Sequence, residues 1–205
     1  MMFYLSEIGV SGSGVSFVAC TPTKESLMSG VNKQATMDDQ QESDQVRDVY
    51  AHFGLAVYLA QCLEQSIFQH LLFFEHFPKA IASFKSKESW ISAFDAFESR
   101  ELGQTMGKLI RRLKEAGQPT DSIQVMLADA LQKRNWLSHG YFPDRAVALT
   151  LESGREKMIG ELESIQLLFR EVAGKIDAIT MPVTRSYGLT DEAMATVMTK
   201  IREDI

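Results

Sequence analysis

The chain has 205 residues, of which 45% are hydrophobic and 23% charged, so it is long enough for one well-packed domain with tails but short for two. Its 21 Lys and Arg residues against 27 Asp and Glu residues give a net charge of −6. This balance argues against a protein that coats duplex DNA through a broad cationic surface, although it leaves room for a small basic patch.

The two cysteines, Cys20 and Cys62, lie far apart and lack the CxxC spacing of zinc and redox sites. We therefore expect two free thiols in a reducing cytoplasm. The most apolar long stretch, 53–74, is interrupted by Gln, Glu and His, and no basic segment precedes the apolar residues of 1–20. We expect neither a membrane span nor a signal peptide.

The N-terminal segment is rich in Ser and Gly and shows no sustained helical period up to residue 37. We expect a flexible tail over 1–43, because such a composition buries too little apolar surface to become ordered. Residues 3–10 and 15–19 have the composition of short strands, but two isolated strands are marginally stable in water.

A long first helix is predicted from about Asp44 to Pro78, where apolar residues recur at three- and four-residue steps. A second helix is expected over 90–97, capped by Ser86 or Ser89. A third is expected over 102–113, ending before Gly117 and Pro119, and these two are either separate helices or one kinked helix.

A fourth helix is expected up to His139, with Asp121 or Thr120 as its cap. Gly140 is expected to end it in a left-handed conformation. A few alternating apolar residues over 147–151 have the pattern of a strand, but no partner strand is in sight.

The remaining pattern predicts a long helix over 153–179 and, after a loop, a short helix opened by Thr190, which either docks or stays free. Helices joined by short links, without strand–helix–strand units or repeats, predict an all-α up-and-down bundle of four to five main helices. We therefore divide the chain into a tail over 1–43, a bundle over 44–180, and a linker with a short C-terminal helix over 181–205.

The motifs of most enzyme classes are missing: there is no Walker or Rossmann glycine loop, GxSxG elbow, HExxH helix or EF-hand loop. His52, His70 and His76 lie on or beside the first helix. His70 and His76 are six residues apart and so point in different directions, whereas helical metal sites place ligands four apart. We expect no metal and no cofactor.

The end of the predicted fourth helix gathers a guanidinium, an amide, an imidazole and a phenol, from Arg134, Asn135, His139 and Tyr141. Arg134 lies on or beside the buried stripe, as Glu64 does in the first helix. Because an unpaired buried charge is unfavourable, we expect Glu64 to face Arg134. The alternative is an ordinary helix end, in which Arg134 extends its stem over the core while Asn135 and His139 satisfy the terminal carbonyls.

The string RNWLSH, residues 134–139, fits the pattern Arg-Asn-x-x-x-His and resembles the HEPN superfamily of small helical bundles, many of which are metal-independent endoribonucleases. With Tyr141, the extended form Arg-x4-His-x-Tyr is similar to HEPN toxins paired with minimal nucleotidyltransferases. The segment Leu59–Glu64 resembles the first helix of many HEPN domains, with an Ala-Gln pair followed by an apolar residue and Glu. The resemblance covers about residues 44–180.

The resemblance implies attack of a ribose 2'-hydroxyl on the adjacent phosphate, giving a 2',3'-cyclic phosphate and a 5'-hydroxyl end. His139 would transfer protons, Arg134 would stabilise phosphoryl charge, and Asn135 would orient the phosphate or His139. Tyr141 would contact RNA, be a modification target, or simply pack. The resemblance also implies a homodimer with both Arg134–His139 segments near its axis. It further implies a stress or defence toxin with an antitoxin or nucleotidyltransferase partner.

A basic run, Lys108, Arg111, Arg112 and Lys114, is compatible with a track for the RNA backbone; the alternative is an ordinary solvated helix face. For the protein as a whole, a second hypothesis stays open. The chain would then be a non-catalytic helical interaction module, a dimer that binds RNA, a nucleotide or a partner protein through the same motif.

Overall fold

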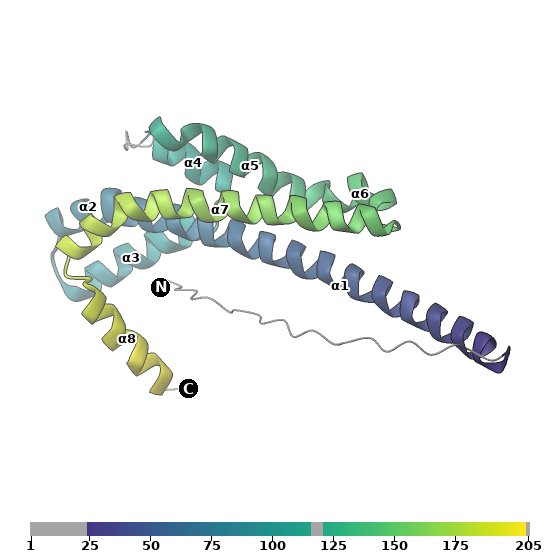
Figure 1. Cartoon of the computed structure of the whole chain (residues 1–205). Coiled ribbons are helices and arrows are strands. Elements are labelled where there is room, and N and C mark those ends of the chain that lie inside the picture. Colours follow the sequence, from purple (N-terminus) through teal and green to yellow (C-terminus); the bar gives the residue numbers. More distant parts are fainter. Residues whose placement is uncertain (1–23, 116–120, 204–205) are drawn as a thin grey trace. The chain divides into compact units, whose positions relative to one another are not determined.

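The structure is a computed structural model that describes residues 24–115 and 121–203. All regular elements of the described residues are helices, so the prediction of an all-α chain is confirmed (Figure 1). A compact unit begins at Glu42, and the residues before it form a separate unit. No helix in the described part of the chain is both long and apolar enough to cross a membrane.

The helices follow one another with short connections. In chain order they are α1 (Lys24–Leu71), a π-helical turn (Leu72–His76), α2 (Phe77–Ala82), α3 (Lys87–Leu102), α4 (Met106–Glu115), a 3-10 turn (Asp121–Ile123), α5 (Gln124–His139), α6 (Tyr141–Leu149), α7 (Glu152–Ser186) and α8 (Asp191–Glu203).

The first helix begins at Lys24, about twenty residues earlier than the apolar stripe predicts. Residues 24–43 contain two Lys, two Glu and three Gln, which are good helix formers, and no Pro, so they favour a helix. Among the residues of α1 from 40 onward, Val49 is the first that is fully buried, and it belongs to the predicted stripe. The strand-like segments 3–10 and 15–19 lie outside the described residues.

The helical path also continues through Pro78, where a helix end is predicted. Immediately before this proline the backbone makes a π-helical turn, and the amide of Phe77 donates to the carbonyl of Leu72, five residues back. Pro78 then lies in the first turn of α2, directly after this π-helical turn, where the wider backbone accommodates the proline ring and its missing N–H.

The second and third predicted helices are separate, α3 and α4, with Gly103–Thr105 between them. Ser86 is the cap of α3: its hydroxyl accepts from the Ser89 amide at 3.2 Å, while the Ser89 hydroxyl accepts from the Ser86 amide at 3.0 Å. The two alternatives from the sequence are thus both used, as the two halves of one capping box.

Two expectations around the fourth helix are wrong. The N-cap position of α5 is Ile123, which makes no side-chain cap, and not residue 120 or 121 as expected; α5 begins at Gln124 after a 3-10 turn, and Thr120 lies outside the described residues. Gly140 is not left-handed, since its φ is −129°, and the next helix, α6, starts directly after it. The strand-like segment 147–151 therefore lies mostly in α6, because three alternating apolar residues are too few to distinguish a strand from a helix.

The long helix α7 lies between α1 and α5 and forms the centre of the compact unit (Figure 1). Its buried face carries a continuous apolar stripe: Met158, Leu162, Ile165, Phe169, Val172 and Ile176. It runs to Ser186, past the predicted end near residue 179, with Pro182 inside the helix. Thr190 caps α8 as predicted, its hydroxyl accepting from the Ala193 amide at 3.2 Å.

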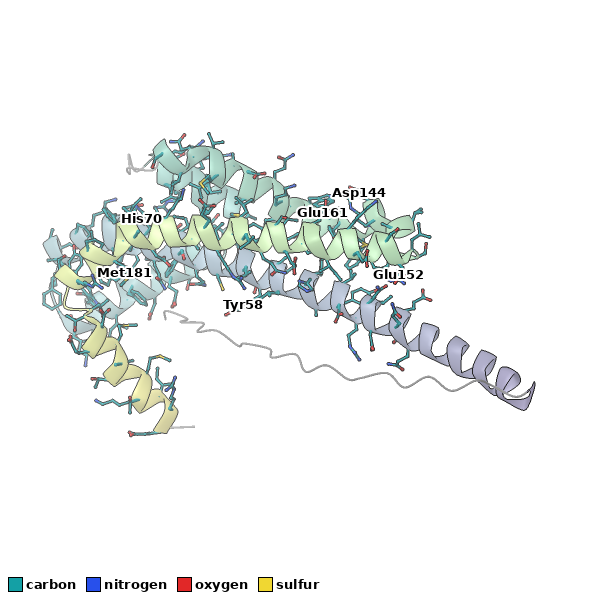
Figure 2. All side chains as sticks on the ribbon, viewed as in Figure 1. Tyr58, His70, Asp144, Glu152, Glu161 and Met181 are labelled. Carbon is teal, nitrogen blue, oxygen red and sulfur yellow. The ribbon has the colours of Figure 1, made fainter. Side chains whose placement is uncertain are left out.

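Polar contacts in the middle of α7 and near its C-terminal end align it with α1. Gln166 donates through Nε2 to the carbonyl of His52 at 3.0 Å. Near the C-terminal end, the Thr180 hydroxyl donates to Ile176 and lies 2.9 Å from Nδ1 of His70, which is labelled in Figure 2. Since Thr180 has only one proton, His70 donates in this pair. These bonds fix the register of the two longest helices.

The corner between α6 and α7 depends on two neighbouring residues. A Cβ on Gly154 would lie 2.1 Å from the carbonyl oxygen of Ala148, so only glycine permits this approach. Arg155, almost fully buried, donates to the carbonyl of Leu149 at 3.1 Å and to Oε1 of Gln45 at 2.8 Å. One guanidinium therefore satisfies the end of α6 and links it to α1.

Replacement of Gly154 by alanine is expected to cost about 1–3 kcal/mol, because the new methyl group meets rigid backbone. The unfolding temperature should fall by several degrees. Gly160 and Gly174 lie on the same helix with open space around them, so alanine there should stabilise by about 0.5–1 kcal/mol. Thermal unfolding of the three variants would contradict this packing if all three shifted in the same direction.

Asp177 provides a test of the polar contacts between α1 and α7. Burial raises its pKa, although a hydrogen bond with Ser66 of α1 partly offsets this rise. A raised pKa in the folded state means that ionisation opposes folding, so the cost is absent below about pH 3.8 and grows as the pH rises. Asp177→Asn is therefore expected to raise the unfolding temperature at pH 7 and to have little effect at pH 3. An equal shift at both values would contradict this assignment.

Candidate active site

Arg134 and Glu64 come together across α5 and α1, as the register of the two helices predicts. Nε of Arg134 lies 3.4 Å from Oε1 of Glu64, with the two side chains 28% and 24% exposed. The pair is partly rather than fully buried. Oε1 of Glu64 is buried and makes no hydrogen bond among the described residues, so the contact is one of charge without hydrogen-bond geometry.

The neighbouring residues of the motif face solvent at the end of α5. Asn135 and His139 are both exposed, and they are four residues apart on one helix face. Oδ1 of Asn135 lies 3.4 Å from Nη1 of Arg134, while the Ser138 hydroxyl donates to the Arg134 carbonyl at 3.0 Å. An accessible imidazole and amide therefore lie within two turns of a guanidinium held by a carboxylate.

Trp136 fixes the corner at which α5 meets α6. Its indole N–H donates to Oδ2 of Asp144 at 2.7 Å, and the guanidinium of Arg145 lies 4.9 Å from the centre of its ring. Arg145 in turn donates to both carboxylate oxygens of Glu161 on α7, at 2.9 and 2.7 Å. Figure 2 labels Asp144 and Glu161 at this end of the bundle. The segment carrying His139 is thus tied to α6 and α7.

Sequence spacing does not predict the contacts made by Asp144, Arg145 and Glu161. The indole and Asp144 are eight residues apart, and Arg145 and Glu161 are sixteen apart, so no helical spacing relates them. Glycine is also needed here, since a Cβ on Gly140 would lie 2.9 Å from Cδ1 of Trp136. The dipeptide Asp144-Arg145 after the motif is the only local signal, and it does not specify partners.

Tyr141 does not reach the solvent. Its side chain is fully buried, its hydroxyl donates to the carbonyl of Met158 at 3.2 Å, and its ring packs against Phe53 and Trp136. Burial raises the pKa of its phenol, which therefore stays neutral. This burial favours the packing alternative, because contact with RNA or modification would each require the phenol to become exposed.

The basic run on α4 divides into two groups. Lys108, Arg111 and Lys114 are exposed. Arg112 turns inward and donates to both carboxylate oxygens of Glu75, at 2.8 and 2.7 Å, and also to Glu101. Its charge is compensated by two carboxylates, so it does not belong to a surface that binds phosphate.

The Arg112 contacts belong to a charge network beside the π-helical turn, in which only Glu101 is completely buried. Burial raises the pKa of Glu75, but hydrogen bonds from Arg112 and Lys79 outweigh this and hold the pKa below its ordinary value. Burial, together with the charge of Arg100, lowers the pKa of the neighbouring His76. This network stabilises the fold and contains none of the motif residues.

The remaining candidate residues are scattered. Cys62 is a half-buried free thiol, and Cys20 lies outside the described residues. His52, His70 and His76 contact different partners along the first helical path. No group of three His, Cys, Asp or Glu side chains within the described ranges is arranged to hold a metal ion.

The structure therefore gathers Arg134, Asn135 and His139 at the end of α5, with Glu64 behind the guanidinium. Trp136 and its partners hold the corner. No protein-family model matches the chain, and comparisons with curated proteins and with solved structures found no match.

Proposed function

We propose that this protein is a metal-independent endoribonuclease of the HEPN type, a HEPN-like bundle of four to five main helices that cleaves RNA in the cytoplasm as a stress or defence toxin. The observation that carries the proposal is the Arg-Asn-x-x-x-His segment at one helix end, with Glu64 beside Arg134 and His139 open to solvent. A homodimer, and an antitoxin or nucleotidyltransferase partner, belong to the same proposal.

In the proposed reaction the ribose 2'-oxygen attacks the adjacent phosphorus and the bond from phosphorus to the 5'-oxygen breaks. His139 takes the proton of the 2'-hydroxyl or delivers one to the departing 5'-oxygen, a task for which imidazole is suited. Arg134 stabilises the charge on the phosphoryl oxygens. Asn135, exposed beside it, orients the phosphate or His139.

The charge pair with Glu64 supports this role for Arg134. A long arginine side chain loses much rotamer freedom when it binds, and a carboxylate that already restrains it reduces this cost. The exposed cations Lys108, Arg111 and Lys114 offer further contacts to the RNA backbone, without Arg112. Such contacts should weaken as the salt concentration rises.

The test is cleavage of a labelled single-stranded RNA by the purified full chain, in the presence of EDTA. We expect products with 2',3'-cyclic phosphate and 5'-hydroxyl ends, and no cleavage of the same oligonucleotide with 2'-deoxyribose at every position. RNA that is bound but not cut would instead support the alternative, a non-catalytic module that binds RNA or a nucleotide. If RNA is neither bound nor cut, the proposal is wrong.

A further inference from the structure

An aromatic ring is exposed beside the candidate active site. Tyr50 of α1 is 52% exposed, and the centre of its ring lies 5.4 Å from that of Phe142 on α6. Within the described ranges its side chain makes no other ring contact and no hydrogen bond. Much of the ring is therefore available to a ligand.

A row of aromatic side chains supports this ring from the core. The ring centres of Phe142 and Phe53 are 4.7 Å apart, and those of Phe53 and the fully buried Tyr141 are 5.6 Å apart. Tyr50 is the exposed end of the row. A ring that already rests on packed neighbours loses little rotamer freedom when a flat ligand stacks on it.

Two contacts place Tyr50 next to the motif residues. Glu64 of α1 lies 3.4 Å from Arg134. Tyr50, earlier on the same helix, contacts Phe142, so α1 passes α5 and α6 in the antiparallel direction (Figure 1). His139 lies between Arg134 and Phe142 along the chain, and the three residues from His139 to Phe142 span at most about 11 Å. The base beside a phosphate held at His139 can therefore reach the ring.

The surroundings of Tyr50 suit a flat, uncharged group. One turn further along α1, a Cβ on Gly54 would have no neighbour within 4 Å, so the flank of the ring is open. One turn earlier, Arg47 pairs with Asp44 at 2.6 Å, and Asp48 beside it is exposed. Since this cation is already paired and two carboxylates lie close by, a phosphate gains little here.

We propose that Tyr50 stacks on an unpaired RNA base, the one next to the phosphate that Arg134 and His139 engage. Proteins bind unpaired bases largely by stacking them on aromatic rings, and every base offers a π-face for this contact. The substrate class is therefore single-stranded RNA, with little preference among the four bases at this position. This inference rests on the proposed ribonuclease and deepens it, and it assigns a role to a residue outside the motif.

The experiment measures binding of a labelled single-stranded 2'-fluoro RNA to the full chain by fluorescence anisotropy. This RNA lacks the attacking 2'-hydroxyl, so it stays intact. Tyr50→Leu should bind it about 5- to 150-fold more weakly, the range for one stacked base. The loss should be the same at low and at high salt, because the ring is uncharged. Tyr50→Phe keeps the ring and should bind like the wild type.

The matched control is Tyr58→Leu, at an exposed tyrosine of the same helix that makes no ring contact within the described ranges. This variant should bind RNA like the wild type. Because Tyr50 is half exposed, circular dichroism should show nearly the same unfolding temperature for all variants. Light scattering should show the same mass for each of them.

The decisive samples are RNAs from which one base at a time has been removed. Loss of the stacked base should weaken binding to the wild type about as much as Tyr50→Leu does, and it should cost the Tyr50→Leu variant nothing further. Equal losses for both proteins at every position overturn the inference. A changed mass of the Tyr50→Leu variant also overturns it, and would assign the ring to an interface between two copies of the chain.

The outcomes separate this inference from the proposed function. If the wild type cuts RNA and Tyr50→Leu binds RNA as tightly as the wild type does, the stacking site is wrong and the ribonuclease stands. If RNA is bound through Tyr50 but not cut, the stacking site stands and the ribonuclease is wrong. A chain that neither binds nor cuts RNA overturns both.

Discussion

Replacement of His139 by alanine is expected to lower RNA cleavage about 10²- to 10⁴-fold, the usual contribution of one general acid or base. The side chain is exposed at the end of α5 and contributes little to packing, so the unfolding temperature should stay nearly constant. RNA affinity should also change little, which places the loss in kcat rather than in KM. Single-turnover cleavage and a separate binding titration would measure these two effects.

The matched control is Gln132→Ala, an exposed residue on the same face of α5 two turns earlier. It should cleave within a few-fold of the wild-type rate. Both variants are to be purified in parallel, so that any contaminating nuclease appears equally in each. Cleavage by the His139 variant at the wild-type rate would contradict the catalytic assignment and leave the binding module as the better account.

Arg134→Ala is expected to behave differently from the His139 variant. It removes the cation proposed for the phosphoryl oxygens and also leaves the partly buried Glu64 without its charge partner. We expect a loss of activity accompanied by a loss of stability on the order of 1–3 kcal/mol. A non-catalytic module would show the same difference in stability between the two variants, but it would have no cleavage to lose in either of them.

Replacement of Arg112 by methionine is expected to destabilise the fold strongly. Glu101 is completely buried, and its contacts to Arg112 and Arg100 compensate its charge. Removing one partner of a buried ion pair costs about 3–5 kcal/mol, and here the buried carboxylate of Glu101 keeps only the half-exposed Arg100 as its counter-charge. For a chain of this size the unfolding temperature should fall on the order of 10 °C.

Two further variants test this explanation. Arg111→Met, at the exposed neighbouring position, should leave the unfolding temperature within about 2 °C of the wild type, as surface substitutions usually do. Adding Glu101→Gln to the Arg112 variant removes the stranded charge and should restore part of the lost stability. If the double variant is less stable than Arg112→Met alone, the uncompensated charge is not the cause.

Acidification should act on the same network. The pKa of Glu75 lies below its ordinary value in the folded state, so its contribution is complete above about pH 4.5 and is lost as the pH falls further. The pKa of His76 is also lowered, and its protonation opposes folding as the pH falls below about 6.5. Both effects have the same sign, and both predict a lower unfolding temperature in acid.

Features that depend on short spacing can be predicted from the sequence. Steps of three and four residues identify the buried stripe of α1 from Val49 onward. The residue types before α3 and α8 limit the cap of α3 to Ser86 or Ser89 and identify Thr190 as the cap of α8. The register of two stripes also predicts that Glu64 faces Arg134. In each case the stabilising contact lies within one helix turn, or it depends on which face of its helix the residue occupies.

Features that depend on distant partners are decided only in the folded chain. Arg112 looks like part of a basic surface, yet carboxylates 11 and 37 residues away turn it inward. Tyr141 looks available to a ligand, yet a carbonyl 17 residues further on and the ring of Phe53 bury it. Spacing along one helix determines which face a side chain occupies, but the charge or apolar surface opposite it comes from another helix. Contacts with that opposite surface form only when the helices pack. They decide whether a side chain that looks exposed from the sequence becomes part of a functional site or part of the core.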